Sequence, residues 1–278
     1  MSEVAQRVRD DILHAIQTDN MVLPTLPEIA LQVREVAEDP DANINTLTQV
    51  IGKDTALSAR VVKVANSPLL RGNRAIEDLK TALMRLGLEY TCNLATGLAM
   101  QQMFQATSDL VDSRLRAVWS RSSEVAGISH VLCRHYTNLR PDQATLAGLV
   151  HQIGVLPILT YAEDHPSLLL DSLTLDRVIE ELHAPLGDRI LSTWKFPEEI
   201  RQVPTQHLDF ARKTSRADYA DIVTVALLQS HMGDASPLSQ VDYSQVTAFE
   251  RLGMDPDMQS AEVEDLSADM EAAAALLR

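Results

Sequence analysis

Residues 147–157 read Ala-Gly-Leu-Val-His-Gln-Ile-Gly-Val-Leu-Pro, an apolar stretch that carries one polar pair, His151-Gln152. Pro141 is well placed to start the helix that leads into this stretch, because a proline in the first turn loses no intrahelical hydrogen bond. The helical spacing continues in four apolar side chains, Leu146, Leu149, Val150 and Ile153. The stretch therefore predicts a helix that carries a histidine and a glutamine.

The block around this helix, residues 113–235, has helical patterns throughout. Apolar or small residues recur with helical spacing from Arg114 to Tyr136 and predict a helix of about six turns. Further helices are expected at 174–182, 184–194, 197–208 and 216–231, separated at Pro185, Pro197 and Pro204. No alternating pattern of convincing length indicates a strand, so the sequence predicts an all-α fold.

The preceding block, residues 20–112, is also predicted to be helical. The prolines of Leu23-Pro-Thr-Leu-Pro27 prevent an earlier helix from continuing. Asn45 and Asp54 are expected to cap two short helices, and Gly87 is expected to end another. The two blocks together predict a two-lobed helical bundle with a boundary near residue 112.

Both ends of the chain carry amphipathic patterns. Residues 1–19 place apolar side chains at steps of four, which predicts an N-terminal amphipathic helix: Val4, Val8, Ile12 and Ile16. Residues 236–278 form an acidic extension that is expected to be partly helical, with four apolar residues on one face of its last helix: Val263, Leu266, Met270 and Leu277. These faces could dock a partner, and packing on the protein's own body is equally open.

The composition argues against several classes of protein. The chain has 278 residues, a net charge of -15 and 24 basic residues against 39 acidic ones, which works against nucleic-acid binding. Its start lacks the apolar segment of a signal peptide, and no apolar run approaches the roughly 18 residues of a membrane span. A cytoplasmic protein without membrane contact is therefore expected. Cys92 and Cys133 lack Cys-x-x-Cys spacing and are expected to be buried thiols.

Several short motifs follow one another in a recognisable order. In the first block they are Leu23-Pro-Thr-Leu-Pro27, Ile51-Gly-Lys-Asp54, Ala65-Asn66-Ser67 and Ala82-Leu-Met-Arg-Leu86-Gly87. In the second block they are Trp119-Ser-Arg-Ser122, Gly148-Leu-Val-His151-Gln-Ile-Gly154, and Gly187 through Trp194-Lys-Phe-Pro197. This order resembles the HDOD family, bacterial signalling domains related to HD metal-dependent phosphohydrolases. The resemblance covers about residues 20–230 and implies an HD-like second lobe, although Thr55 stands where the family commonly has proline.

The resemblance also implies where a metal site would lie. An HD hydrolase holds divalent metal with two histidines and two aspartates, and the metal lowers the pKa of a bound water. The matching positions here are Arg121, His151, Gln152 and Leu227, so only His151 keeps the expected type. Glutamine lacks the anionic charge that offsets desolvation of a dication, and Arg121 would bring positive charge to the same place. We therefore expect no metal, no cofactor and no hydrolytic centre.

Four further residues are candidates for a cleft between helices. His183 begins a helical stretch that contains the small Gly187, so it could face the same cleft as His151. A hydrogen-bonded histidine between helices is the alternative, and a weak metal site made by the two histidines stays open. Trp119, Trp194 and Asn66 could line the cleft or serve as core anchors and turns. The other histidines are interpreted as surface or capping residues: His130, His135, His165, His207 and His231.

Two functions compete. The first is a non-catalytic signalling module that binds a partner protein or a small effector, with a partner from a two-component or cyclic-dinucleotide pathway implied by the resemblance, and with a homodimer possible. The second is a residual metal-dependent phosphohydrolase or phosphodiesterase that uses His151 and His183. Stoichiometric metal and turnover abolished by a chelator would distinguish the second from the first.

Overall fold

The computed structural model describes residues 10, 14, 23–67, 70, 75–233, 235–256 and 261–277. Across these residues all regular secondary structure is helical and no strand occurs, which confirms the all-α prediction. The predicted amphipathic helix of residues 1–19 lies outside the described residues, apart from Asp10 and His14.

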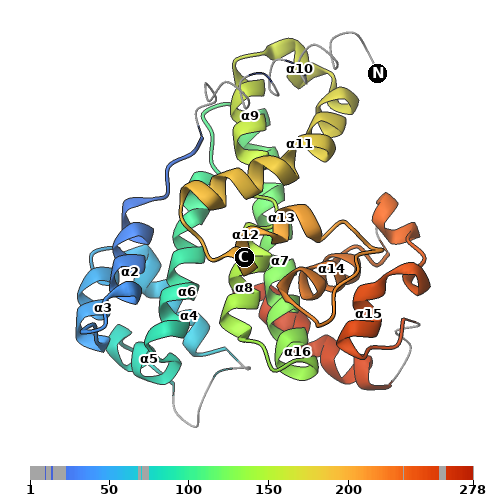
Figure 1. Cartoon of the computed structure of the whole chain (residues 1–278). Coiled ribbons are helices and arrows are strands. Elements are labelled where there is room, and N and C mark those ends of the chain that lie inside the picture. The colour runs from blue at the N-terminus through green and yellow to red at the C-terminus, as the bar shows by residue number, and fades with distance from the viewer. Residues whose placement is uncertain are drawn as a thin grey trace.

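The first lobe contains the helices drawn from blue to teal in Figure 1. They are α2 (Glu28–Glu38), α3 (Ile44–Ile51), α4 (Thr55–Ala65), α5 (Leu79–Leu86), α6 (Leu88–Ala99) and the 3-10 helix η1 (Met100–Met103). The expected cap at Asp54 is confirmed, because its carboxylate accepts a hydrogen bond from the N–H of Leu57 at 2.9 Å. The expected cap at Asn45 is wrong. Asn43 caps α3 instead, since its Oδ1 accepts from the N–H groups of Asn45 and Thr46.

The second lobe is built around α7 (Asp109–Tyr136) and α8 (Pro141–Val150), which lie at the centre of Figure 1. The remaining helices are α9 (Val155–Glu163), α10 (Pro166–Leu170), α11 (Ser172–Thr193), α12 (Glu198–Arg201), α13 (Val203–Gln206) and α14 (Tyr219–Ser230). α14 packs against both α7 and α8. Pro141 does begin α8, and the boundary expected near residue 112 falls within the first turn of α7.

Pro185 does not separate two helices as expected, because α11 continues through it. A proline inside a helix removes one hydrogen bond and leaves the carbonyl four residues earlier without its donor. That residue is Glu181, which stands at an exposed position of α11. The prediction failed because the pattern of prolines does not show which face of the helix meets solvent.

The extension after residue 235 wraps back onto the protein. It contains η2 (Pro237–Gln240), η3 (Tyr243–Gln245), α15 (Thr247–Leu252) and α16 (Ala261–Leu277). α15 packs on α14, and α16 packs on α7 and α4. The predicted apolar face of α16 is turned inward at Leu266, Met270 and Leu277, while the side chain of Val263 lies outside the described part of the structure.

The two lobes meet through α6, which packs on α2 within the first lobe and on α8 in the second. Large, fully enclosed side chains lie on both sides of this contact: Leu98, Met100 and Phe104 before it, and Leu149 and Ile153 after it. Full burial of one such side chain stabilises the fold by about 1.5–3 kcal/mol. The lobes therefore share one apolar core.

One helical stretch, Pro141–Glu163, is long and apolar enough to span a membrane by length and composition alone. This corrects the expectation that no run approaches that length. In the structure the stretch is α8 and α9 with the turn between them, and 83% of its apolar window is buried inside the protein. Such burial is typical of core helices in folded domains.

Candidate functional site

His151 lies at the turn that joins α8 to α9, and its side chain is completely buried. Its Nδ1 is 2.6 Å from the carbonyl oxygen of Gly148. Because a carbonyl can only accept, the hydrogen is on Nδ1 and donates to Gly148. The lone pair of Nε2 consequently remains available, and this enclosed atom has no hydrogen-bond partner among the residues that the structure describes.

Two more imidazoles gather around His151. The ring of His207 lies 5.1 Å from that of His151, and the ring of His183 lies 6.1 Å from that of His207, measured between centroids. Nδ1 of His183 donates to the carbonyl of Ile179 at 2.8 Å, and Nδ1 of His207 donates to the carbonyl of Val203 at 2.9 Å. All three rings therefore have the same tautomer when neutral. We call His151, His183 and His207 the histidine cluster.

Burial keeps the histidine cluster uncharged at neutral pH. The pKa of His151 is lowered to about 4, chiefly by desolvation; the hydrogen bond to Gly148 opposes this effect, and the nearby rings of His183 and His231 add to it. Desolvation also lowers the pKa of His183, and it lowers that of His207 well below the ordinary value. The cluster thus presents neutral nitrogen acceptors and no cation.

Close backbone contacts fix the helices that carry the cluster. A Cβ atom on Gly154 would lie 1.9 Å from the carbonyl oxygen of His183, so only glycine lets the start of α9 touch α11 there. A Cβ on Gly187 would lie 2.7 Å from Cβ of Pro204, which brings α11 against α13 as the small residue suggested. These contacts hold His183 and His207 at fixed positions beside His151.

The surroundings of the histidine cluster do not fit a hydrolytic metal centre. Gln152 is a neutral amide, and Leu227 is a buried apolar residue of α14. Arg121 donates to the carbonyl of Ser230 and pairs with Glu124 at 3.4 Å. Across the described residues, no group of three or more histidine, cysteine or carboxylate side chains is placed to hold a metal ion. A divalent phosphohydrolase centre needs anionic oxygen ligands, and neither Gln152 nor Leu227 supplies one.

A separate cleft of about 270 Å³ lies between the lobes, at the opposite end of α8. α2 and α6 of the first lobe form one wall, and the start of α8 and α12 form the other. Its lining residues are Arg34, Ala37, Glu38, Glu89, Cys92, Asn93, Thr96, Arg140, Gln143, Leu146, Phe196, Pro197 and Ile200. The volume of this inter-lobe cleft is slightly below the roughly 300 Å³ at which ordinary small-molecule pockets begin.

Polar bonds cross the inter-lobe cleft at its floor. Asn93 donates to the carboxylate of Asp142 at 2.6 Å, and Arg140 pairs with Glu89 at 2.6 Å. Burial raises the pKa of the Cys92 thiol to about 12, so this thiol stays protonated and is a poor nucleophile. The inter-lobe cleft therefore offers amide and guanidinium hydrogen bonds and no nucleophile of this kind.

A guanidinium also joins the lobes at the edge of the inter-lobe cleft. Arg34 of α2 donates to the carbonyls of Trp194 and Lys195, at 2.9 Å for Lys195, and lies 4.4 Å over the ring of Phe196. The indole N–H of Trp194 in turn donates to the carbonyl of Pro24 at 3.0 Å. The turn between α11 and α12 is thus bound directly to the first lobe.

The chain was compared with protein-family models. The model described as the HDOD domain matches residues 23–210, which is more than half of the chain. The chain belongs to the HDOD domain family.

Relatives of this HDOD protein include a solved structure from Shewanella amazonensis SB2B named as a candidate metal-dependent phosphohydrolase. It is 30% identical with a TM-score of 0.87, and the match covers 99% of each chain. A candidate signal transduction protein from Marinobacter aquaeolei VT8 is 23% identical with a TM-score of 0.66, over 98% of this chain and 66% of that one, and shows the fold alone. An uncharacterized protein from Treponema pallidum (strain Nichols) is 24% identical over 196 residues. That match covers 64% of this chain and only 36% of the Treponema protein.

The histidines of the HDOD domain were only partly predicted. His151 and His183 do lie near one another, since the ring of His183 acts on the pKa of His151. The interpretation of His130 as a surface or capping residue is wrong, because it lies buried inside α7. His207 does stand at the C-terminal cap of α13, as the capping interpretation allowed, but it is buried and not on the surface. His207 lacks a spacing signal because it follows two four-residue helices that only tertiary packing brings to α8. The motif Trp194-Lys-Phe-Pro197, which precedes those helices, was the one available sign that this segment folds inward.

The other cleft candidates are engaged within the HDOD fold. Asn66 forms two hydrogen bonds with the backbone of Ile76, each of 2.8 Å, so its amide closes a loop. Trp119 is buried, its ring 5.2 Å from that of Phe104. Trp194 is also buried. None of these side chains is among the residues that line the inter-lobe cleft.

Proposed function

We propose that this HDOD protein is a non-catalytic signalling module that binds a partner protein or a small effector in the inter-lobe cleft. The observation that carries the proposal is the histidine cluster, which brings together three neutral imidazoles in a part of the chain where the described residues form no group of three or more side chains placed to hold a metal ion. The histidine cluster lies in the HD-like lobe, where the resemblance to HD phosphohydrolases would place the hydrolytic centre. We also propose that the protein is cytoplasmic and that it contacts neither nucleic acid nor membrane. A homodimer is part of the same proposal.

Charge balance supports the non-catalytic part. A divalent cation loses several kcal/mol of hydration on entering a buried site, and anionic ligands normally offset that loss. Gln152 supplies no anion, and the guanidinium of Arg121 bonds Ser230, the residue before His231, which acts on the pKa of His151. Neither position therefore supplies the negative charge that a divalent cation would need.

The architecture of the inter-lobe cleft supports the binding part. Its walls come from both lobes, so a bound molecule would contact α2 and α6 on one side and α8 and α12 on the other. Its amide and guanidinium groups can fix the orientation of a polar ligand. Because the chain resembles HDOD regulators, we further propose that its partner belongs to a two-component or cyclic-dinucleotide pathway.

The first experiment measures metal content and hydrolysis. We expect protein purified from manganese- and zinc-supplemented cells to contain far less than one metal ion per chain, and to hydrolyse no phosphodiester with added Mn²⁺. Gln152→Asp should remain inactive, because Arg121 and Leu227 are unchanged. Stoichiometric metal with chelator-sensitive turnover in the natural protein would overturn the non-catalytic assignment.

The second experiment tests the inter-lobe cleft. Proteins and small molecules retained from native cells are compared between the natural chain and Gln143→Ala, whose side chain lines the inter-lobe cleft. Gln245→Ala, at an exposed position, serves as the matched control. A specific ligand should be lost only with Gln143→Ala, while both variants stay folded; Gln143→Ala should lower the unfolding temperature slightly, because Gln143 accepts a hydrogen bond from the hydroxyl of Tyr219. A ligand retained equally by all three proteins would place the binding surface elsewhere.

A second candidate is a residual metal-dependent phosphohydrolase or phosphodiesterase. The observation that favours it is the unpartnered Nε2 of His151, which adjoins two further imidazoles of the same tautomer. Three histidines are a known ligand set for zinc, with a water as fourth ligand. This candidate predicts one bound transition metal that is lost in His183→Gln.

A further inference from the structure

The charged groups of the inter-lobe cleft do not favour an anionic ligand. Nε and Nη2 of Arg140 donate to Asp142 at 3.3 and 2.6 Å, and its Nη1 pairs with Glu89 at 2.6 Å. Arg34, which also bonds the turn between α11 and α12, pairs with Glu38 at 3.5 Å. Two guanidiniums are thus balanced by three carboxylates, so a phosphate or carboxylate group gains no net attraction there.

Uncharged hydrogen-bonding groups remain at the inter-lobe cleft, on Asn93, Thr96 and Gln143. Nδ2 of Asn93 donates to Asp142 at 2.6 Å, which leaves its Oδ1 as an acceptor. Oε1 of Gln143 accepts from the hydroxyl of Tyr219 at 2.6 Å, which leaves its Nε2 as a donor. Burial raises the pKa of Tyr219 to about 12, so this hydroxyl keeps the hydrogen that it donates. The two amides therefore offer one acceptor and one donor.

Thr96 of α6 supplies the observation that points to a ligand. It is 2% exposed and lines the inter-lobe cleft, and its hydroxyl forms no hydrogen bond with any residue that the structure describes. Thr91 on the same helix instead donates to the carbonyl of Gly87 at 2.7 Å. A buried hydroxyl without a partner destabilises a fold. Since Thr96 lies one turn after Asn93, a molecule in the inter-lobe cleft could bond both.

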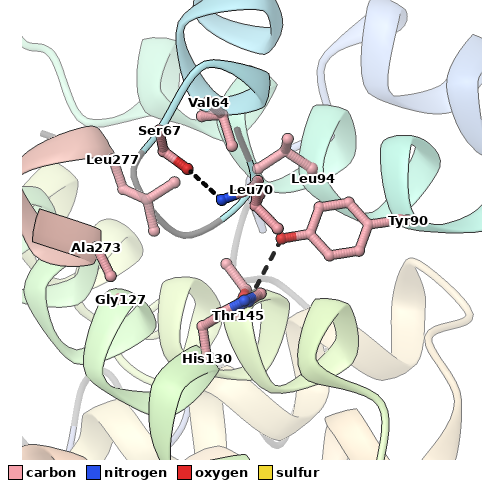
Figure 2. Close-up of a pocket in the computed structure, with 10 residues that line it drawn as sticks. All are labelled: Val64, Ser67, Leu70, Tyr90, Leu94, Gly127, His130, Thr145, Ala273 and Leu277. Atoms are coloured by element: carbon pink, nitrogen blue, oxygen red, sulfur yellow. Dashed lines mark hydrogen bonds between the residues drawn. The ribbon is translucent and has the colours of Figure 1, made fainter. Parts of the chain in front are cut away.

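The cavity beneath α16, shown in Figure 2, lacks both the room and the free groups. It has a volume of about 20 Å³, enough for about one water molecule. Its polar side chains bond one another, because Nδ1 of His130 is 3.1 Å from the hydroxyl of Thr145 and 3.4 Å from that of Tyr90. The inter-lobe cleft, at about 270 Å³, combines a larger space with polar groups that have bonds left to make.

Apolar side chains form the rest of the inter-lobe cleft. They are Ala37, Leu146, Phe196, Pro197 and Ile200. Small-molecule sites commonly combine such apolar walls with a few polar groups that fix the orientation of the ligand. The faces of a flat ring would contact the apolar walls, while its edge meets the amides and the hydroxyl. The modest volume favours one ring or a fused pair of rings.

We propose that the inter-lobe cleft binds a small uncharged ring compound with an amide edge, in which a ring N–H adjoins a carbonyl, as in a nucleobase or another lactam. Oδ1 of Asn93 accepts from the ring N–H, Nε2 of Gln143 donates to the carbonyl, and the hydroxyl of Thr96 bonds a further polar atom. Glu38 and Glu89 disfavour phosphorylated forms of the same ring. This inference rests on the binding function proposed above and names the chemical class of the effector.

Isothermal titration calorimetry with the full chain tests the class of ligand. The probes are uracil and hypoxanthine, each compared with its fully N-methylated derivative and with its 5′-monophosphate nucleotide. We expect at least one of the two bases to bind, and its N-methylated derivative and its nucleotide to bind at least tenfold more weakly. A nucleotide that binds as tightly as its base would overturn the proposal, and so would the failure of both bases to bind at millimolar concentration.

Two variants test the residues. Thr96→Val should weaken binding of the base at least fivefold without lowering the unfolding temperature, because the hydroxyl that it removes has no partner in the free protein. Gln143→Glu keeps an acceptor for Tyr219 but replaces the donor by a carboxylate, and should abolish binding. Unchanged affinity in both variants would overturn the proposal.

Thr91→Val is the matched control, since it makes the same substitution at a buried position of α6 outside the inter-lobe cleft. It should bind the base like the natural chain but unfold at a lower temperature, because it loses the bond to Gly87. The opposite pattern in Thr91→Val and Thr96→Val would make the Thr96 hydroxyl structural and overturn its assigned role.

The outcome can be told apart from that of the proposed function. If Gln143→Ala loses a ligand from native cells while neither base binds the purified chain, the inter-lobe cleft is a binding site and the amide-edge class is wrong. If no cell ligand depends on Gln143 and neither base binds, both proposals fail.

Discussion

At the scale of single residues, the contact between Gly154 and the carbonyl of His183 is the tightest constraint on the histidine cluster. We expect Gly154→Ala to destabilise the protein by about 3 kcal/mol or more, because the added methyl must push backbone atoms apart. Gly253→Ala is the comparison, since nothing lies near its Cβ position and only its positive φ of 68° is strained, which costs about 1 kcal/mol. Urea denaturation measures the free energy of unfolding of both variants. Equal losses of stability would mean that the contact between Gly154 and His183 does not constrain the fold.

Asn66 makes a second residue-scale prediction. Its amide both donates to and accepts from the backbone of Ile76. Asn66→Asp should destabilise the protein by about 2 kcal/mol, because a carboxylate cannot donate to the Ile76 carbonyl and two acceptors then face each other. Asn45→Ala, at an exposed position, should change the free energy of unfolding by less than about 0.5 kcal/mol. An aspartate as stable as the natural amide would mean that the loop closes without this bond.

The candidate site could be predicted from the sequence only where a motif surrounds the residue. His151 stands in a recognisable run and His183 precedes the small Gly187, so both were identified. His207 belongs to no such run, and its burial follows from the way two very short helices fold back on α11 and α14. Long-range packing of this kind leaves no periodic signal along the chain.

At the scale of helices, the ion cluster of Arg212, Asp221 and Arg251 joins the C-terminal extension to α14. Asp221 is buried and accepts from Nη2 and Nε of Arg251 at 2.6 and 2.9 Å, and from Arg212 at 2.8 Å. Arg251→Met should cost about 2–4 kcal/mol, because it leaves a buried carboxylate with one partner fewer. Arg116→Met, which breaks the exposed pair with Asp112, should cost less than about 1 kcal/mol. Equal losses in thermal unfolding would show that burial of Asp221 is unimportant.

Most helices were predictable because each buries one face, and a buried face repeats every three or four residues. The predictions that failed concern caps and helix ends, which depend on residues that are neighbours in space. Asn43 and Asn45 are equally suited to cap α3 in isolation, and Pro185 ends a helix only if the carbonyl it frees is enclosed. The Pro141–Glu163 stretch is apolar enough for a membrane but is enclosed by other helices of the same chain.

At the scale of the whole molecule, buried histidines should make the fold sensitive to mild acid. Desolvation lowers the pKa of His130 and His151 to about 4 and also lowers those of His183 and His207. In the unfolded chain the same groups titrate near 6.5. The unfolded state therefore binds more protons between about pH 6.5 and 4, and stability is present above this window and lost as pH falls through it.

The pH dependence of the free energy of unfolding checks this expectation. Each buried histidine contributes a slope of up to about 1.4 kcal/mol per pH unit inside the window. His183→Gln should reduce the slope by about one proton, whereas His165→Gln, at an exposed position, should leave it unchanged. A slope that is the same in both variants would mean that His183 titrates normally in the folded protein.

The bond from the Trp194 indole to Pro24 gives this protein an optical reporter of its own. The chain contains only one other tryptophan, Trp119, which is buried against Phe104. In a Trp119→Phe background the emission maximum of Trp194 would shift to longer wavelength whenever the first lobe separates from α11 and the indole meets water. Opening and closing could then be timed in stopped-flow mixing without attaching any dye.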